Sequence, residues 1–340
     1  MILVTGGNGF IGSNFIKLAI QKFKKKISNI DALTYAGVEN NLQLIANNSD
    51  YSFFKGSIND KTFITKVLNE NRPNSVVHFA AESHVDRSIT EPDAFIETNI
   101  GGTFNLLKAT KNYWEDLKEH EKENFRFIHI STDEVYGSLD FKDEPFKETS
   151  AYAPNSPYSA SKAASDHLAR AYFKTYNFPV ITSHCSNNYG PNQFPEKFIP
   201  VIITKAFECL EIPIYGDGLQ IRDWIYVKDH CEAIFKILEK GEPGETYNIG
   251  GNAEISNIEL AKKICNSIDQ IHPITGINRE NLIKHISDRP GHDRRYAINI
   301  QKIKNELKWS PKTNLDDGLI NTVNWYLENI DWAKNCLREN

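Results

Sequence analysis

The chain has 340 residues, of which 40% are hydrophobic and 24% are charged, and its 19 glycines and 14 prolines are ordinary numbers. This composition excludes a collagen-like or largely disordered chain and allows one large domain, or about two that share a cleft. With 39 basic and 44 acidic residues the net charge is −5, so no general positive field would bind nucleic acid or an anionic membrane.

Other features of the sequence predict a protein of the cytoplasm. The five cysteines are far apart and form no C-x-x-C pair, which is typical of a reducing compartment. No apolar run approaches the roughly 18 residues of a membrane span, and the chain starts with a predicted strand instead of a signal peptide. The ten histidines include no H-E-x-x-H or other compact ligand spacing, so we expect no metal site.

The first half of the chain alternates short apolar runs with segments whose apolar residues have helical spacing. This alternation is typical of a parallel sheet flanked by helices. Strands are predicted at residues 2–4, 27–31, 51–54, 75–80, 125–131 and 180–185. Helices are predicted at residues 11–20, 95–113 and 158–176. Six such strands favour an α/β fold with a doubly wound, Rossmann-type parallel sheet.

A glycine-rich loop at residues 5–12 joins the first predicted strand to the first predicted helix. Glycines let the backbone approach a pyrophosphate, and a helix N-terminus offers unpaired N–H donors. The spacing fits both G-x-G-x-x-G, which begins at Gly7, and G-x-x-G-x-x-G, which begins at Gly6. Asp31 ends the second strand, where a carboxylate binds ribose hydroxyls and repels a 2′-phosphate, so NAD is favoured over NADP. The alternative is an ordinary tight turn beside an unrelated aspartate.

Two adjacent carboxylates follow the fifth predicted strand, in Thr132-Asp133-Glu134. They lie at the carboxyl end of a strand, where open parallel sheets bind ligands. Neighbours on a regular strand face opposite sides, so both could serve one substrate only if the backbone turns there. Gly137 indicates such a turn. The alternative is a solvated loop in which Asp133 or Thr132 caps the next helix.

Tyr158 and Lys162 are four residues apart on a predicted helix and therefore share a face. Lowering the phenol pKa by about 3 units needs roughly 4 kcal/mol. One cation at about 4 Å supplies that order of energy at an effective dielectric constant near 20. Tyr51 and Lys55 have the same spacing, but on a strand they lie roughly 13 Å apart. The alternative for Tyr158 and Lys162 is a pair of helix-surface residues.

Together the glycine loop, residues 132–134 and Tyr158-Ser159-Ala160-Ser161-Lys162 resemble the extended short-chain dehydrogenase/reductase family, and within it the nucleotide-sugar 4,6-dehydratases. The resemblance spans almost the whole chain and includes residues 80–88, 187–190, 196–200, 222–224 and 288–293. It implies NAD as the cofactor and a nucleotide sugar, dTDP-glucose, as the substrate. UDP-glucose is the alternative, because the sequence leaves the choice between thymine and uracil open.

The resemblance also implies a division of the chain. Proline- and glycine-rich loops between short elements begin after about residue 188. Residues 1–188 would form the NAD-binding Rossmann domain, which carries the catalytic residues. Residues 189–340 would form mainly a smaller, loop-rich α/β lobe that binds the nucleotide sugar, with some segments returning to the first domain.

The resemblance further implies roles for individual residues. The catalytic set would be Thr132, Asp133, Glu134, Tyr158 and Lys162. NAD would contact Gly6, Gly9, Phe10, Ile11, Gly12, Asp31, Leu33, Thr34, Ser57, Ile58, Ala80, Ala81, Thr98, Tyr158, Lys162 and Asn188. The nucleotide sugar would contact Ser83, His84, Thr132, Asn187, Lys197, Phe198, Pro213, Tyr215, Arg222, Asn257, Asp288, Arg289 and His292. Ser57 stands where the family usually has an aspartate near the adenine, and it brings no charge.

In the implied reaction Tyr158 takes the proton of the sugar 4-hydroxyl while hydride passes from carbon 4 to NAD. The resulting ketone makes the hydrogen on carbon 5 acidic, and Glu134 removes it. Asp133, protonated, donates to the departing 6-hydroxyl, and hydride returns to carbon 6. Thr132 would orient the 4-oxygen. One carboxylate must be charged and the other neutral, and their proximity separates their pKa values.

Two other functions compete with this interpretation. A nucleotide-sugar 4-epimerase would use the same tyrosine, lysine and NAD, but it needs no acid–base pair. A non-catalytic NAD-binding scaffold would need neither Tyr158 nor Lys162. The resemblance also implies a homodimer formed by the helices at 95–113 and 158–176. The small residues that would permit close helix packing there are Ala160, Ala163, Ala164 and Ala171.

Overall fold

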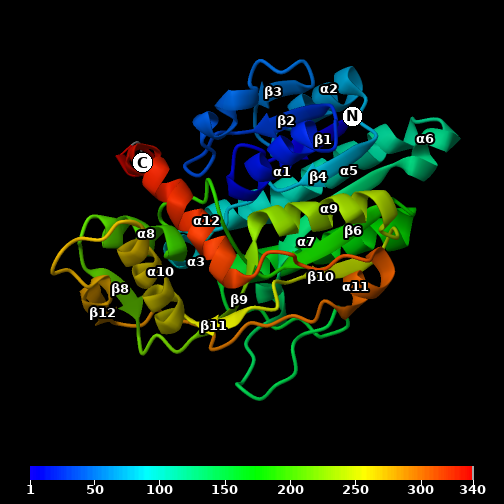
Figure 1. Ribbon diagram of the computed structural model, residues 1–340. Helices are drawn as coiled ribbons and strands as arrows, with labels where there is room; N and C mark the ends of the chain where they lie inside the picture. The colour runs from blue at the N-terminus through cyan, green and yellow to red at the C-terminus, as the bar shows by residue number, and fades with distance from the viewer. Residues whose placement is uncertain (339–340) are drawn as a thin grey trace.

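A seven-stranded parallel sheet is the centre of the computed structural model, which describes residues 1–338 (Figure 1). Its strand order is β10-β6-β5-β4-β1-β2-β3, and every neighbouring pair is parallel. The strands are β1 (Ile2–Thr5), β2 (Ile27–Asp31), β3 (Tyr51–Lys55), β4 (Ser75–His78), β5 (Arg126–Thr132), β6 (Val180–Cys185) and β10 (Thr246–Ile249). The predicted doubly wound fold is confirmed, but the expected number of six strands was one too few.

Helices cover both faces of this sheet because successive strand residues point to opposite sides. Ile2 and Val4 belong to a core shared with α1 (Phe10–Gln21) and α9 (Val227–Lys240). Leu3, between them in the sequence, belongs to a second core on the other face. That second core is closed by α2 (Lys61–Asn71), α5 (Thr103–Glu115) and α7 (Pro157–Tyr176).

The helix predicted at residues 95–113 is interrupted near its start. α4 (Asp93–Phe95) leads into a π-helical segment, η2 (Ile96–Gly102), which continues as α5. Such wider turns are rare and are frequent at functional sites. The remaining short elements of this part are η1 (Glu39–Ile45), α3 (Val85–Thr90), α6 (Glu119–Asn124) and η3 (Asp133–Tyr136).

A second lobe lies beside the sheet, on the left in Figure 1. It contains a three-stranded sheet, β11-β9-β7, and the two-stranded pair β12-β8. Isoleucines and aromatic residues of its helices form a third core. Its elements are β7 (Asn187–Tyr189), α8 (Phe198–Phe207), β8 (Ile212–Tyr215), β9 (Ile221–Tyr226), β11 (Glu254–Ser256), α10 (Asn257–Ile271), η4 (Arg279–Leu282), β12 (Ile283–Ile286), α12 (Leu315–Glu328) and α13 (Ile330–Arg338).

Several segments after residue 188 pack on the large sheet. α9 packs against α1, where the rings of Phe15 and Phe235 stack at 4.6 Å. β10 pairs with β6, and α11 (Gln301–Leu307) lies against β10. The division of the chain at residue 188 remains a prediction.

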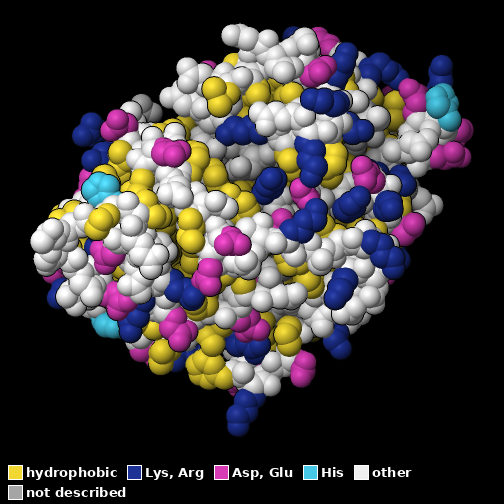
Figure 2. Space-filling model, viewed as in Figure 1, with side chains coloured by type: hydrophobic (Ala, Val, Ile, Leu, Met, Phe, Trp, Pro, Cys, Tyr) yellow, Lys and Arg dark blue, Asp and Glu magenta, His cyan; other side chains and the backbone are white. Residues whose placement is uncertain are grey.

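The surface carries charges of both signs. On the face shown in Figure 2, lysine and arginine side chains are interspersed with acidic and hydrophobic ones. Within residues 1–338 no helix is long and apolar enough to span a membrane. Within the same range no three His, Cys, Asp or Glu side chains are grouped so that they could hold a metal ion.

Candidate active site

A cleft of about 620 Å³ lies where the carboxyl ends of the large sheet face the second lobe. The loop after β1, the end of β2, η3, α7 and the second lobe all contribute to its lining. Ligands bind at this edge in open α/β sheets. The lining includes every residue predicted for the catalytic, cofactor and substrate sites except Leu33 and Asp288. The individual roles of these residues remain predictions.

The glycine loop brings backbone, without side chains, to one end of the cleft. Gly6 has φ +73°, and a Cβ there would lie 2.5 Å from the Ala80 nitrogen. A Cβ on Gly12 would lie 2.3 Å from the Gly6 oxygen. Gly6, Gly9 and Gly12 line the cleft, whereas a Cβ on Gly7 would meet Asn29. Of the two spacings that the sequence allowed, the G-x-x-G-x-x-G pattern is therefore the one that lines the cleft.

The same end of the cleft fits a dinucleotide. α1 starts at Phe10 with no side-chain cap, so N–H groups of its first turn are available to a pyrophosphate. Asp31 lines the cleft, and its two oxygens accept hydrogen bonds from the Asn8 and Leu33 nitrogens, both at 2.8 Å. Burial raises the pKa of Asp31, and these two hydrogen bonds oppose the rise. Leu33 thus holds Asp31 in place and does not itself line the cleft.

The π-helical segment places Thr98 in the cleft lining. Next to it, Asn99 accepts a hydrogen bond from the Glu82 nitrogen at 2.9 Å and donates to the Glu82 oxygen at 3.0 Å. The Asn99 amide also donates to Ser161 Oγ, at 2.9 Å. The wider helical turn is therefore tied to the loop after β4 and to α7.

Tyr158 and Lys162 lie on the first turns of α7, which starts with a capping box at Ser156 and a proline at its first position. The Tyr158 hydroxyl forms a hydrogen bond with Thr132, and Lys162 Nζ donates to the Ile130 oxygen at 2.7 Å. Burial raises the pKa of Tyr158 well above its usual value, the charge of Glu134 adds to the rise, and the Thr132 hydrogen bond opposes it. The protein residues by themselves therefore raise the phenol pKa instead of lowering it as expected, because desolvation of the phenolate dominates.

The turn that the carboxylate pair requires is present. β5 ends at Thr132, whose Oγ1 accepts a hydrogen bond from the Glu134 nitrogen at 3.3 Å and so caps η3. Both carboxylates line the cleft. Thr132 thus caps the next helix, as the alternative expected, but the segment is not the solvated loop of that alternative, because Thr132 and Asp133 are buried.

The two carboxyl groups have different electrostatic surroundings. Asp133 is only 2% exposed, and burial, followed by the charges of Glu134 and Asp223, raises its pKa well above the usual value. Burial also raises the pKa of Glu134, but three cations oppose the rise: Arg222, Arg289 and Lys197. Asp293 adds to the rise at Glu134, so both pKa values are raised, and the pKa of Asp133 is raised well above its usual value.

Cations gather on the second-lobe side of the cleft. Lys197 Nζ donates to the Ser83 oxygen at 2.9 Å, and the buried Arg222 packs over the Tyr296 ring at 4.2 Å. Arg289 pairs with Asp86 at 2.8 Å. Asp288 lies outside the cleft lining and holds His292, whose Nδ1 is 2.6 Å from its Oδ1. Convergent Lys and Arg side chains suit a diphosphate.

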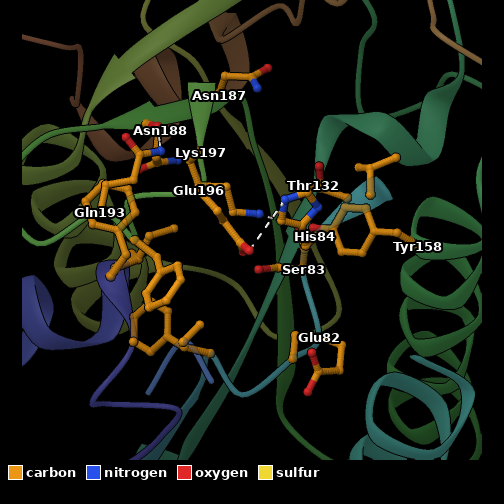
Figure 3. Close-up of a pocket in the computed structure, with 18 of the residues that line it drawn as sticks. Glu82, Ser83, His84, Thr132, Tyr158, Asn187, Asn188, Gln193, Glu196 and Lys197 are labelled. Carbon is orange, nitrogen blue, oxygen red and sulfur yellow. Dashed lines mark hydrogen bonds and ion pairs between the residues drawn. The ribbon is translucent and has the colours of Figure 1, made fainter. Parts of the chain in front are cut away.

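Several residues that line the cleft were not predicted from the sequence, among them Glu82, Glu196 and Tyr296. Glu196 points at His84, with 3.6 Å between the carboxylate and Nε2 (Figure 3), and lies 3.5 Å from Arg87. Glu196 directly precedes Lys197 in residues 196–200, a segment of the family resemblance, and this position was the sequence signal for it. Nothing in the sequence around Tyr296 indicated its position beneath an arginine.

Comparisons with known proteins agree with this geometry. The family model described as GDP-mannose 4,6 dehydratase matches residues 3–322. The dTDP-glucose 4,6-dehydratase of Xanthomonas campestris pv. campestris (strain B100) is 54% identical over 336 residues, 98% of this chain and 95% of that protein. The chain belongs to the dTDP-glucose 4,6-dehydratase family. The family resemblance seen in the sequence is thereby confirmed.

Solved structures extend the similarity to three dimensions. The dTDP-glucose 4,6-dehydratase DesIV of Streptomyces venezuelae, determined with NAD bound, has a TM-score of 0.90 and 40% identity, covering 98% of this chain and 99% of that one. A UDP-glucose 4-epimerase of Thermotoga maritima has a TM-score of 0.84 but only 29% identity, covering 97% of this chain and 99% of that one. Dehydratases and epimerases thus share the scaffold, and the sequence is nearer to the dehydratases.

Proposed function

We propose that the protein is an NAD-dependent lyase that dehydrates dTDP-glucose to dTDP-4-keto-6-deoxyglucose. The observation that carries this proposal is the pair of the buried Asp133 and the half-buried Glu134, which lines the same cleft as Tyr158. An epimerase has no elimination to catalyse and no use for this pair. The relatives of this chain that are named dTDP-glucose 4,6-dehydratase favour thymine over uracil as the base of the substrate.

Tyr158 is the base for the sugar 4-hydroxyl in this proposal. Its hydrogen bond to Thr132 places both hydroxyls at one point, where they would hold the 4-oxygen. Since burial and Glu134 raise the Tyr158 pKa, positive charge must offset them at the moment of proton transfer. Lys162 on the next turn of α7 supplies one such charge. NAD, held by the glycine loop and Asp31, would supply a second, and its chemistry would be to accept hydride from carbon 4 and later return it to carbon 6.

Asp133 and Glu134 carry out the elimination. Once carbon 4 is a ketone, Glu134 removes the proton from carbon 5, since the negative charge can spread to the 4-oxygen. The cations Arg222, Arg289 and Lys197 oppose the rise that burial causes in the Glu134 pKa, and so favour the charged form that this step needs. Asp133, whose pKa burial raises well above its usual value, donates its proton to the 6-hydroxyl, and water leaves. When hydride later adds to carbon 6, Glu134 would return a proton, exchanged with solvent, to carbon 5.

Incubation with dTDP-glucose and, separately, UDP-glucose tests the proposal. We expect a 4-keto-6-deoxy product from dTDP-glucose, with deuterium at carbon 5 when the reaction runs in D₂O. A 4-epimer without a ketone would identify an epimerase and contradict the proposal. A ketone formed faster from UDP-glucose would overturn the choice of base alone.

We also propose that two copies of the chain form a dimer through α5, η2 and α7. Three large apolar side chains are exposed there, namely Ile96 (51%), Phe104 (40%) and Tyr176 (47%). Of the four alanines expected to line this contact, Ala163 is buried within the chain against Val135, so it does not contribute to the surface. All five cysteines are free, which supports placing the protein in the reducing cytoplasm.

A further inference from the structure

A buried carboxylate that does not line the cleft lies on the side of α7 that faces the sheet. Asp166 accepts hydrogen bonds from His129 Nε2 at 2.9 Å and His184 Nε2 at 3.0 Å. Ser131 Oγ and the Tyr152 hydroxyl also donate to it, at 2.9 and 3.2 Å. Its side chain is 3% exposed. One carboxylate therefore joins β5, β6, α7 and the loop before α7, although no step of the proposed reaction uses it.

This carboxylate connects the two elements that hold the proposed catalytic residues. Tyr158, Lys162 and Asp166 are spaced at four-residue intervals and share one face of α7. The Asp166 partners on β5, His129 and Ser131, come just before the segment that begins with Thr132. A change in the Asp166 contacts would therefore shift α7 against the end of β5.

The network continues from Asp166 to the carboxylate pair itself. His184 Nδ1 is 2.6 Å from the hydroxyl of Tyr136, which also donates to Asn248 Oδ1 at 2.9 Å. Tyr136 is the last residue of η3, the short helix that carries Asp133 and Glu134. Thr132 is held separately, because it pairs with Cys185 in the sheet. The Tyr136 hydroxyl therefore anchors the two carboxylates but not Thr132.

The charge of Asp166 supports the same interpretation. Burial alone would raise its pKa, but the hydrogen bonds from His129 and His184 outweigh burial and lower the pKa. The carboxylate is therefore charged at neutral pH. Burial lowers the pKa of Lys162, and the charge of Asp166 opposes this fall. Asp166 thus helps Lys162 to stay an ammonium ion.

We propose that Asp166 and Tyr136 are positioning residues for the two halves of the reaction. Asp166 holds α7, with Tyr158 and Lys162, against β5, whereas Tyr136 holds η3 so that Asp133 and Glu134 face carbons 5 and 6. The inference rests on the proposed dehydration of dTDP-glucose. It assigns a separate effect to each residue, which a role in stability alone would not produce.

Three variants test this inference: Tyr136→Phe, Asp166→Asn and the control Tyr113→Phe. Tyr113 is also buried, and its hydroxyl donates to the Pro73 oxygen at 3.0 Å, away from the cleft lining. For each variant, absorbance of reduced nicotinamide in a single turnover measures oxidation at carbon 4. Deuterium uptake from D₂O measures proton removal at carbon 5.

Misplacement of a reacting group by about 1 Å can cost about 100-fold in rate. We expect Tyr136→Phe to slow exchange at carbon 5 by about 10- to 100-fold and to leave oxidation within about twofold of the parent. Reduced nicotinamide should therefore accumulate in this variant. Asp166→Asn should slow both steps, and Tyr113→Phe neither.

Equal slowing of both steps in Tyr136→Phe, or exchange at the parent rate, would overturn the inference. If Asp166→Asn does not fold, the comparison of Tyr136→Phe with Tyr113→Phe still decides the matter. A parent protein that leaves dTDP-glucose unchanged would overturn the proposed function and this inference with it. An active parent with an unaffected Tyr136→Phe variant would overturn the inference alone.

Discussion

The Glu134→Gln substitution separates the two halves of the proposed reaction. Glutamine has nearly the size of glutamate, and the residue 134 nitrogen still donates to Thr132 Oγ1, so η3 keeps its cap. The variant loses the group to which the proposal assigns removal of the proton on carbon 5. Tyr158, Lys162 and the glycine loop are unchanged.

The structure predicts opposite effects on the two steps. Loss of a positioned general base typically costs about 10²- to 10⁴-fold in rate, or about 3 to 5 kcal/mol of activation free energy, so dehydration should fall by that amount. Burial and the charge of Glu134 both raise the pKa of Tyr158. Removal of that charge should therefore lower the Tyr158 pKa, and oxidation at carbon 4 should not become slower.

Rapid mixing of the variant with dTDP-glucose provides the assay. We expect the absorbance of reduced nicotinamide to rise and persist while 4-keto-6-deoxy product forms slowly. Glu82→Gln is the matched control, because Glu82 also lines the cleft but has no assigned step. Dehydration by Glu134→Gln at the parent rate would refute the reasoning, and so would slow dehydration without reduced nicotinamide.

Four further predictions follow from the same structure. Tyr158→Phe should give no reduced nicotinamide at all, because no base remains for the 4-hydroxyl; a rise in its absorbance would count against Tyr158. NAD should not be consumed, so a requirement for one added NAD per product would exclude hydride return. Phe104→Asp should give monomers by light scattering if α5 forms the dimer contact, and an unchanged dimer would contradict this. The pKa of Asp133 is higher in the folded protein than in the unfolded chain, so its contribution to stability is present at low pH and is lost as the pH rises through the folded-state pKa. Asp133→Asn should flatten this fall in thermal melts, and an identical pH profile would contradict the assignment.

Much of the fold was predictable because it depends on local pattern. The six strands expected from the sequence are present, α1 follows the glycine loop, and α7 begins at the Ser156 capping box. β10 was missed because Thr246–Ile249 is a four-residue strand that is recognisable only by its pairing with β6. The π-helical segment was missed because its apolar spacing resembles that of an ordinary helix; in the structure its Asn99 contacts residues 82 and 161, which lie far away in the sequence.

The sequence by itself determined which chemical groups are present and how residues that are close in the chain are placed relative to one another. The glycine loop, the adjacent pair Asp133 and Glu134, and the spacing of Tyr158 and Lys162 are local, so their geometry follows from one helix or one turn. Only the tertiary structure decided the different electrostatic surroundings of the two carboxylates, because the cations that oppose the rise in the Glu134 pKa come from residues 197, 222 and 289. The anchor of η3 depends likewise on His184 and Asn248, which are 48 and 112 residues away from Tyr136. Desolvation and long-range hydrogen bonds arise only when distant segments pack together, so no local pattern records them.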